Sequence, residues 1–232
     1  MNGAIMQPYF LPYIGYFQLI ASVEQFILYD NIKYTKKGWI NRNRMLLNGT
    51  DTTFSLPLKK GADSLNIVER ELSLEFDRSK LLKKFKGAYN GAPYFDQTYS
   101  VLERIIRHQD ANLFRYIHHS IVQLCEHLDI KTKIQISSEI AIDHNLKSQN
   151  KVLALCKATG INNYINTIGG IDLYSKDDFR IQDINLQFIK TYPFEYAQFG
   201  MPFIPWLSII DVLMFNPIED VIRIIRHKFE LI

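Results

Sequence analysis

The first thirty residues of the chain alternate between two apolar patterns, and this alternation constrains the fold more than any other feature of the sequence. A short apolar run, Ala4 to Met6, leads into a proline-spaced turn, after which Tyr13, Phe17 and Ile20 recur at helical spacing. Gln25 to Tyr29 is β-branched and aromatic, which predicts a second strand. A strand, a helix and a strand within about 30 residues predict a right-handed βαβ unit, and therefore a parallel sheet.

Later segments predict that this α/β pattern is interrupted by helices and then resumes. Thr53 to Leu58 is typical of a third strand, whereas Asp30 to Asn48 looks irregular and turn-rich. No segment between residues 65 and 128 resembles a strand, and Asn112 to Leu128 has the spacing of an amphipathic helix with Asp110 as its N-cap. Strands are then predicted at 133–136, 163–167 and 186–191, and helices at 146–159, 206–215 and 217–229.

We therefore predict the α/β fold class, with a Rossmann-like parallel-sheet domain and a mainly helical insertion. The sheet domain comprises residues 1–64 and 130–232, and the insertion comprises residues 65–129. In such sheets, ligands bind at the carboxyl ends of the strands, because loops and helix N-termini with unpaired N–H groups converge there. Candidate site residues are therefore expected in the segments that follow predicted strands.

The composition excludes several classes of protein. Hydrophobic residues make up 47% and charged residues 22%, which excludes wholesale disorder. A formal charge of +3 is too small for a general nucleic-acid or membrane-binding surface. Two cysteines, and no apolar run near the ~20 residues that span a bilayer, predict a cytoplasmic protein that is neither exported nor inserted into a membrane. The 13% of aromatic residues, many of them tyrosine, suit polar, ring-shaped ligands.

Gln7 to Phe17 (QPYFLPYIGYF) is the strongest candidate for a binding segment. Two prolines, a glycine and several aromatic residues fall within a predicted strand-to-helix turn. Gly15, in the first turn of the following helix, lets a ligand or another backbone approach closely. The alternative is a proline-rich turn whose rings fill the core. We predict that this loop binds substrate through Gln7, Tyr9, Tyr13 and Gly15.

Asn31 to Thr50 contains five cations and no acidic residue, a pattern that indicates local anion binding. The cations are Lys33, Lys36, Lys37, Arg42 and Arg44, and they are interleaved with Tyr34 and Trp39. Arg42 lies between two asparagines, where its guanidinium could hold a phosphate by charge-assisted hydrogen bonds while rings stack a base or a sugar. The alternatives are a solvated basic loop and single-stranded RNA binding. The predicted substrate-binding residues here are Lys36, Lys37, Trp39, Asn41 and Asn43, with Arg42 in a catalytic role.

Three further groups of polar or glycine residues are candidates. Asp30 directly follows the second predicted strand, where it could act as a general base or cap the loop through neighbouring N–H groups. Ser208 and Asp211 share one face of an apolar helix, facing a ligand or buried backbone. Gly169 and Gly170 end a predicted strand, although they lack a nucleotide-binding glycine motif. We expect these groups, the first loop and the Trp39 to Arg44 segment to line one cleft.

The sequence gives little indication of a metal or nucleophile site. The six histidines show no zinc-ligand spacing, so no metal is predicted. No G-x-S-x-G elbow is present. Cys156 is typical of a small buried hydrophobe, and a thiolate near Lys151 or Lys157 is the alternative.

Four separated blocks give the sequence a family resemblance over its whole length. They are Ile5 to Ile20 (IMQPYFLPYIGYFQLI), Gly38 to Arg44 (GWINRNR), Tyr164 to Asn166 with Gly169 and Gly170, and Trp206 to Asn216 (WLSIIDVLMFN). With these blocks the chain resembles the WbqC-like protein family, found in bacterial surface-polysaccharide (O-antigen) gene clusters. Thr167 departs from the family pattern, which has Pro there, and Asn31 stands where the family more often has a second Asp, which weakens a paired-carboxylate site.

The resemblance implies assembly or modification of activated amino sugars, and it supplies no catalytic residue. We predict a transferase that attaches an acyl or aminoacyl group to the amine of a nucleotide-linked amino sugar. The sequence does not choose between coenzyme A, a carrier-protein thioester and another activated acyl group as the donor. Asp30 would take the amine proton, the cations would neutralise phosphate, and Tyr9, Tyr13 and Trp39 would stack. The alternative is a non-catalytic sugar-nucleotide binding or scaffold protein of the same pathway. Neither hypothesis includes a nucleic-acid partner, and an acyl carrier protein is a partner only under the first.

Overall fold

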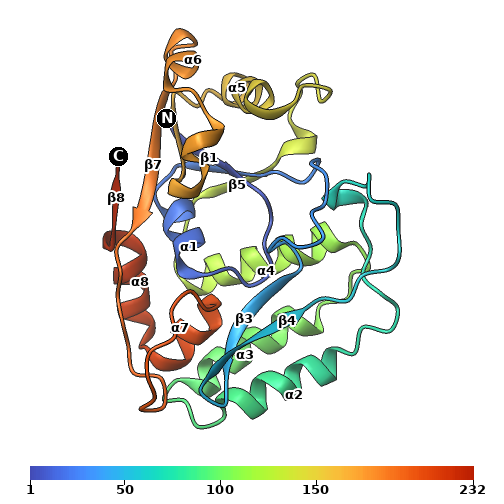
Figure 1. The fold of residues 1–232 in the computed structure, drawn as a ribbon, viewed down its shortest axis with the longest axis vertical. Coiled ribbons are helices and arrows are strands. Elements are labelled where there is room, and N and C mark those ends of the chain that lie inside the picture. Colours follow the sequence, from blue (N-terminus) through green and yellow to red (C-terminus); the bar gives the residue numbers. More distant parts are fainter.

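Six strands form one sheet, and all but the last run parallel to one another. The computed structural model describes residues 1–232, and its strand order is β5-β2-β1-β6-β7-β8 (Figure 1). The strands are β1 (Asn2–Met6), β2 (Gln25–Leu28), β5 (Lys133–Ile136), β6 (Asn163–Thr167), β7 (Asn185–Thr191) and the antiparallel β8 (Phe229–Leu231). The order reverses at β1, which pairs with β2 on one side and β6 on the other. The predicted α/β class is therefore confirmed.

Alternate residues of the central strands enter two separate apolar layers, as the pleat of a sheet requires. Ala4 and Phe26 belong to a cluster of 47 buried residues, whereas Ile5 and Ile27 belong to a cluster of 11. Figure 1 shows α5 (Ser148–Thr159) and α6 (Lys176–Ile181) above the sheet, with α1 (Ile14–Ala21) and α4 (Leu113–His127) below it. Both faces are covered, which explains why successive residues of β1 and β2 are buried.

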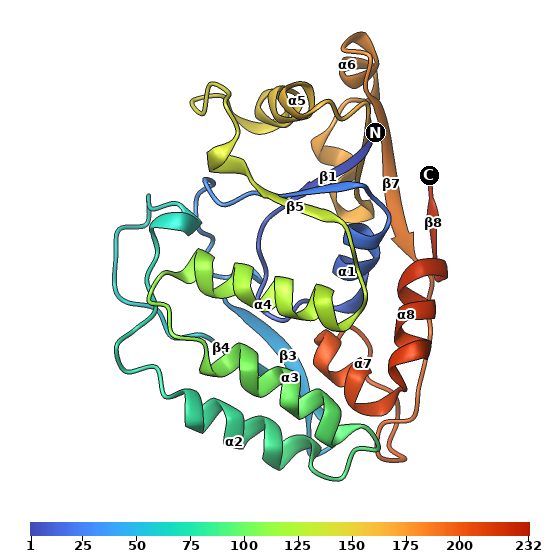
Figure 2. The ribbon, with the colours of Figure 1, turned by 180° about the vertical axis from the view of Figure 1, so that it is seen from behind.

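The segment between β4 and β5 is helical, as predicted, and it shares the core of the sheet. It contains η1 (Ile67–Glu69), α2 (Arg78–Tyr89), α3 (Phe95–Arg107) and α4 (Figure 2). Their buried side chains belong to the same 47-residue cluster as those of β1, α1 and β2. These helices therefore stabilise the lower face of the sheet directly.

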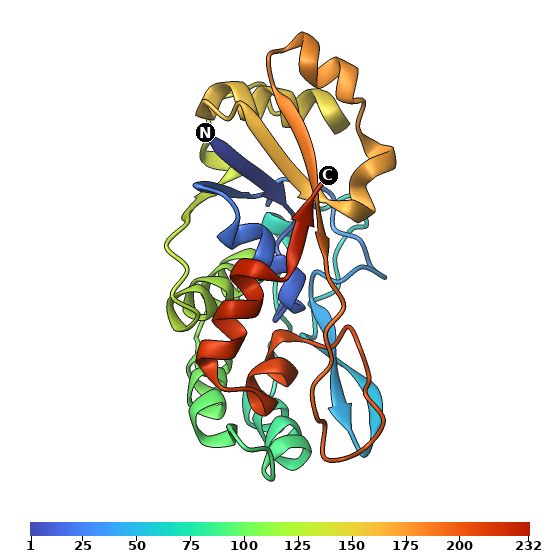
Figure 3. The same cartoon turned by 90° about the vertical axis from the view of Figure 1, so that its left-hand side faces the viewer.

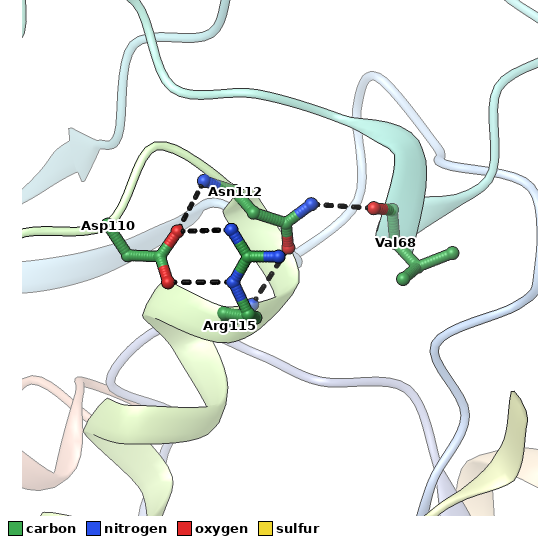
Figure 4. A network of polar contacts seen from close by, with 4 residues as sticks. All are labelled: Val68, Asp110, Asn112 and Arg115. Carbon is green, nitrogen blue, oxygen red and sulfur yellow. Dashed lines mark hydrogen bonds and ion pairs between the residues drawn. The ribbon is translucent and has the colours of Figure 1, made fainter. Parts of the chain in front are cut away.

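The N-terminus of α4 is fixed by a small polar network rather than by the predicted cap (Figure 4). Asp110 is not the N-cap; that position is held by Asn112, whose Oδ1 accepts from the Arg115 N–H at 3.0 Å. The Asn112 amide also donates to the Val68 carbonyl at 2.7 Å, which ties α4 to η1. Asp110 accepts from the Asn112 N–H and from the Arg115 guanidinium.

Residues 42–55 form a separate antiparallel hairpin, β3 (Arg42–Leu47) and β4 (Thr50–Ser55), and do not join the main sheet. The irregular segment predicted at 30–48 was therefore wrong from residue 42 onward, because residues 42–47 form β3. The strand predicted at 53–58 is β4, which spans residues 50–55. Asn48 and Gly49 both have positive φ, 51° and 73°, as a two-residue hairpin turn requires. The Asn-Gly pair between two strand-like runs was the signal for this turn.

The C-terminal elements begin later than predicted. Trp206 has a φ of 63°, which no helix interior accommodates, so α7 (Ile209–Phe215) starts after the cap Ser208. Helix α8 (Ile218–His227) follows Pro217, and β8 was not predicted. Short 3-10 turns, η2 (Ser137–Glu139) and η3 (Ile168–Leu173), follow β5 and β6. No helix combines the length and the apolar character needed to cross a bilayer.

Candidate functional site

The first loop, residues 7–13, leaves the carboxyl end of β1 at the point where the strand order reverses. In Figure 3 the arrow of β1, next to the N-terminus, points toward the side of the molecule on which the β3–β4 hairpin lies. This is the edge at which open α/β sheets bind ligands. The hairpin and the 192–208 segment approach the same loop.

Three of the sequence blocks meet at the backbone of this loop. The Leu11 carbonyl accepts from Asn43 Nδ2 at 2.8 Å and from Ser208 Oγ at 2.7 Å. The Phe10 N–H donates to the Ile40 carbonyl, and the Ile209 N–H donates to the carbonyl of Pro12. Leu11 is fully buried and has a φ of 46°, a conformation that these bonds stabilise. Asn43 and Ser208, both predicted to bind substrate, therefore hold the loop in place.

Aromatic rings from the three blocks surround a pocket of about 270 Å³, which we call the aromatic groove. It is lined by Tyr9, Pro12, Tyr13, Trp39, Asn43, Arg44 and Trp206. The rings of Tyr13 and Trp206 meet edge to face at 6.0 Å between centroids. The guanidinium of Arg44 lies 5.8 Å from the Trp39 ring, and that of Arg42 lies 5.5 Å from it. The structure thus brings Tyr9, Tyr13 and Trp39 together, as predicted.

A second pocket of about 300 Å³, the apolar pocket, lies on the other side of Tyr13 and Trp206. Those two residues line both pockets, so the pockets share a wall. Its other lining residues are mostly apolar or aromatic: Ile14, Thr191, Tyr192, Pro193, Phe194, Glu195, Tyr196, Phe203, Pro205, Leu207 and Val212. Burial raises the pKa of the Tyr13 hydroxyl, and the Thr191 side chain partly offsets this rise. Glu195 is the one carboxylate in the lining of either pocket.

Gly15 serves the loop rather than a ligand. A Cβ on Gly15 would lie 2.4 Å from three atoms of the Tyr13 side chain, well inside van der Waals contact. The missing side chain therefore lets the Tyr13 ring fold back over the first turn of α1. The expectation that Gly15 admits a ligand is corrected to this packing role.

Asp30 follows β2, as predicted, but it has no exposed surface and lines neither pocket. Its Oδ1 accepts from Ser137 Oγ at 2.8 Å and from the Ser138 N–H at 3.0 Å. Its Oδ2 accepts from Ser138 Oγ at 2.6 Å. These bonds join the ends of β2 and β5. Asp30 therefore makes structural contacts, but its donors lie after β5 and are not the neighbouring N–H groups of the capping alternative.

The cations of the 31–50 segment are partly engaged with the protein. Lys36 forms an ion pair with Asp63 at 2.6 Å, so acidic compensation comes from outside the segment. Arg42 donates from Nε to the Gly38 carbonyl at 3.0 Å and from Nη2 to the carbonyl of Lys37. The Lys37 side chain is exposed and lines neither pocket.

Asp211 is fully buried, and its partners are side-chain hydroxyl and amide donors rather than the buried backbone expected as the alternative to a ligand. Its carboxylate accepts from Tyr89 Oη at 2.8 Å, Tyr196 Oη at 2.6 Å and Gln198 Nε2 at 2.7 Å. Burial raises the pKa of Asp211, and these three hydrogen bonds oppose that rise. Tyr196 lines the apolar pocket, so the network positions its wall.

The remaining candidates lie outside both pockets. The Gln7 carbonyl accepts from Tyr16 Oη at 2.9 Å. Asn41 accepts from Tyr34 Oη and donates to the Leu56 carbonyl. Gly169 and Gly170 form part of η3, where Gly170 packs against the Asn166 amide and Gly169 is exposed. The single cleft predicted for all the groups is thus reduced to the aromatic groove, with Asp30, Asp211, Gly169 and Gly170 outside it.

Comparison with known proteins agrees with the sequence blocks that build this site. The model of the WbqC-like protein family matches residues 7–223. The chain belongs to this family. It is also 27% identical over 219 residues to the uncharacterized protein Rv1507c of Mycobacterium tuberculosis (strain ATCC 25618 / H37Rv), with 92% of each chain covered. No solved structure matches it.

Sequence reasoning missed several lining residues of this WbqC-like site. Trp206 was assigned to a helix, although a tryptophan directly after a proline, 62% exposed in the structure, marks a loop. Arg44 was counted among the cations but not among the site residues. Glu195 and Tyr196 lie in a Tyr-Pro-Phe-Glu-Tyr run after β7, and an aromatic run after a predicted strand was the available signal.

Proposed function

We propose that this protein is a transferase that acylates or aminoacylates the amine of a nucleotide-activated amino sugar in surface-polysaccharide biosynthesis. The observation that carries the proposal is the shared wall of Tyr13 and Trp206 between the aromatic groove and the apolar pocket. Two substrates of different chemistry could meet there, one polar and ring-shaped, the other apolar. Family membership is consistent with this assignment.

The sugar nucleotide would occupy the aromatic groove. Rings such as Trp39 and Trp206 stack on the flat faces of sugars and bases, and an arginine beside them pairs with phosphate oxygens. Arg44 is the arginine that lines the groove, and Arg42 lies on the same tryptophan ring. Arg44 also pairs with Asp51 through Nη1 at 3.0 Å and donates to the Trp206 carbonyl through Nη2 at 3.1 Å, so a phosphate would share this guanidinium with them. Arg42 lines neither pocket, so its proposed contact with phosphate rests on Nη1 beside the Trp39 ring, since Nε and Nη2 donate to backbone carbonyls.

The acyl group of the donor would occupy the apolar pocket, next to Glu195. The amine nitrogen forms a bond to the acyl carbon while the bond from that carbon to the thioester sulfur breaks. The amine proton passes to the Glu195 carboxylate, which replaces Asp30 as the proposed base because Asp30 lines neither pocket. Glu195 then returns this proton to the leaving thiolate, which departs as a thiol.

Tryptophan fluorescence gives a direct binding assay, because the chain contains two tryptophans and both line the aromatic groove. Titration with UDP- or dTDP-linked amino sugars should change this fluorescence. Trp206→Ala should weaken binding by about 5- to 150-fold, given ~1–3 kcal/mol per stacked ring. The control is Phe199→Ala, an exposed aromatic residue of the same loop that lines neither pocket and should change Kd by less than about twofold.

Catalysis is tested by incubating the protein with the amino sugar and thioester donors and measuring product mass. Glu195→Gln should lower turnover by about 10²-fold or more while leaving the Kd of the sugar nucleotide nearly unchanged. Glu219→Gln, at an exposed glutamate on α8, is the matched control. Turnover that survives Glu195→Gln would contradict the assigned base.

A second candidate is a non-catalytic sugar-nucleotide binding protein. One observation favours it: no cysteine, histidine, serine or lysine lines either pocket, so acid–base chemistry would fall to Glu195 and the tyrosine hydroxyls alone. Fluorescence quenching by the sugar nucleotide, without a mass change for any donor, would support this second function over the first.

A further inference from the structure

A third pocket, of about 360 Å³, lies where the loop after β2 meets the loop before η1. We call it the Arg70 pocket, and it is lined by Lys33, Tyr34, Thr35, Lys36, Asp63 and Arg70. The Tyr34 N–H donates to the Leu65 carbonyl at 3.0 Å, and the Ile67 N–H donates to the carbonyl of Ile32 at 2.9 Å. The two loops are thus joined by backbone hydrogen bonds, and the pocket has fixed walls.

Arg70 is buried in this pocket without an acidic partner. Only 7% of the residue is exposed, and its Nε, which is buried, has no hydrogen-bond partner. Nη1 donates to the Ala62 carbonyl at 3.3 Å, and the guanidinium lies 4.9 Å from the centre of the Tyr34 ring. Buried polar groups are normally hydrogen-bonded and buried charges are normally paired, so this side chain lacks a counter-charge.

The charges around the pocket favour an anion with more than one negative charge. Lys33, Lys36 and Arg70 supply three positive charges against the single carboxylate of Asp63, which leaves two in excess. The Asp63–Lys36 ion pair is exposed, at 65% for Lys36 and 69% for Asp63. Exposed pairs of this kind contribute little, so Lys36 is free to turn toward a ligand.

We propose that the Arg70 pocket is an oxyanion site that binds a phosphoryl group. The guanidinium over the Tyr34 ring presents its N–H groups in one plane, the geometry that phosphate oxygens match. Lys33 and Lys36, both exposed at the mouth, would neutralise the remaining charge. The phosphoryl group could come from a nucleotide or from free phosphate, and the inference does not depend on the proposed function.

The test measures the Kd of inorganic phosphate by calorimetry at low, constant ionic strength. Arg70→Met and Lys33→Gln should each weaken binding by about tenfold or more, as expected for charge-assisted hydrogen bonds to phosphate. Asp63→Asn should tighten binding, because it removes the only negative charge of the pocket. Lys33→Gln and Asp63→Asn change exposed side chains, so they remain informative if Arg70→Met does not fold.

The matched control is Lys37→Gln, an exposed lysine next to Lys36 that does not line the pocket. Its Kd for phosphate should stay within about twofold of the unchanged protein. The proposal is overturned if the unchanged protein binds no phosphate, if Lys37→Gln weakens binding as much as Lys33→Gln, or if Asp63→Asn does not tighten it.

A second arm identifies the source of the phosphoryl group. If UDP binds with tryptophan quenching and Lys33→Gln weakens that binding, the pocket holds the phosphate of a nucleotide. If inorganic phosphate binds and UDP affinity is unchanged in Lys33→Gln, the pocket holds a separate phosphate. Trp206→Ala should leave phosphate binding intact in either case, so failure of the transferase proposal is distinguishable from failure of this one.

Discussion

Asp211 offers a sharp test of how the wall of the apolar pocket is held. Its carboxylate accepts three buried hydrogen bonds, from Tyr89, Tyr196 and Gln198, at 2.6–2.8 Å. Asp211→Ala leaves the Tyr89 and Tyr196 hydroxyls without an acceptor and removes one of the two hydrogen bonds that Gln198 Nε2 donates. Each lost bond costs ~1–3 kcal/mol, less the desolvation of the carboxylate that is recovered. We expect a loss of about 3–5 kcal/mol in the free energy of unfolding.

Asp211→Asn should cost less, about 1–3 kcal/mol, because one oxygen remains to accept hydrogen bonds. The control is Asp220→Asn, which breaks an exposed i, i+3 pair with Arg223 and should cost less than about 1 kcal/mol. Urea denaturation of the three variants and the unchanged protein gives the ranking. A loss for Asp211→Ala no larger than that for Asp220→Asn would refute the network as a stabilising feature.

The stability difference between the unchanged protein and Asp211→Asn should depend on pH. Burial raises the pKa of Asp211 above its ordinary value, so the folded state binds more protons than the unfolded state in the range above pH 3.8. The unchanged protein therefore loses stability as pH rises from 3.8 through the folded pKa, whereas Asp211→Asn lacks this change. The stability difference between them should be largest in acid and smaller at neutral pH.

The network also reaches the groove. Gln198 donates to the Ile204 carbonyl at 3.2 Å and accepts from the Ile204 N–H at 2.7 Å, which fixes the loop that carries Trp206. Asp211→Ala should therefore shift tryptophan fluorescence as well as stability. A destabilised variant with unchanged fluorescence would separate the core role of Asp211 from its role in the loop.

Three further perturbations test other parts of the structure. Asn112→Ala removes the N-cap of α4 and the hydrogen bond that joins this helix to η1 (Figure 4). Urea denaturation should show a loss of about 1–3 kcal/mol in the free energy of unfolding, and a loss under ~0.3 kcal/mol would contradict the capping role of Asn112. Gly15→Ala should cost about 1–3 kcal/mol through overlap with the Tyr13 ring, and much less in a Tyr13→Ala background, as a double-mutant cycle would measure. Burial raises the pKa of the Cys125 and Cys156 thiols to about 12. Above pH 9 the folded state therefore keeps thiol protons that the unfolded state loses. Above pH 10 the hydroxyls of buried tyrosines, whose pKa is also raised, behave in the same way. Stability should fall by up to ~1.4 kcal/mol per pH unit per group, and a melting temperature constant from pH 8 to 11 would contradict this.

The main sheet was predictable because its signals are local. The strands at 133–136 and 163–167 have the predicted bounds, and Gly160, with a φ of 73°, ends α5 as expected. Short apolar runs bounded by turn residues carry this information without any tertiary contact. The hairpin was missed for a different reason: β3 contains Arg42, Asn43 and Arg44, and polar residues masked its alternation.

The site was harder to predict because its residues are selected by contacts between distant segments. The sequence indicates that Ser208 and Asp211 share a face, but not that Ser208 meets the Leu11 carbonyl, 197 residues earlier. In the same way, Lys36 looked uncompensated until the fold brought Asp63 beside it. Side-chain type and position after a strand narrow the search to one edge of the sheet, and long-range packing decides which residues are exposed there.

The loop between β2 and β3 shows how one basic segment comes to serve two places. Arg42 and Arg44 lie against the Trp39 ring, and Arg44 lines the aromatic groove, whereas Lys33 and Lys36 line the Arg70 pocket. Tyr34 separates them, because its ring supports Arg70 and its hydroxyl donates to Asn41, the residue before β3. Apart from the exposed Lys37, the cations of this loop therefore fall into two groups that the buried contacts of Tyr34 separate, so a loss of phosphate affinity can be assigned to one group without altering the other.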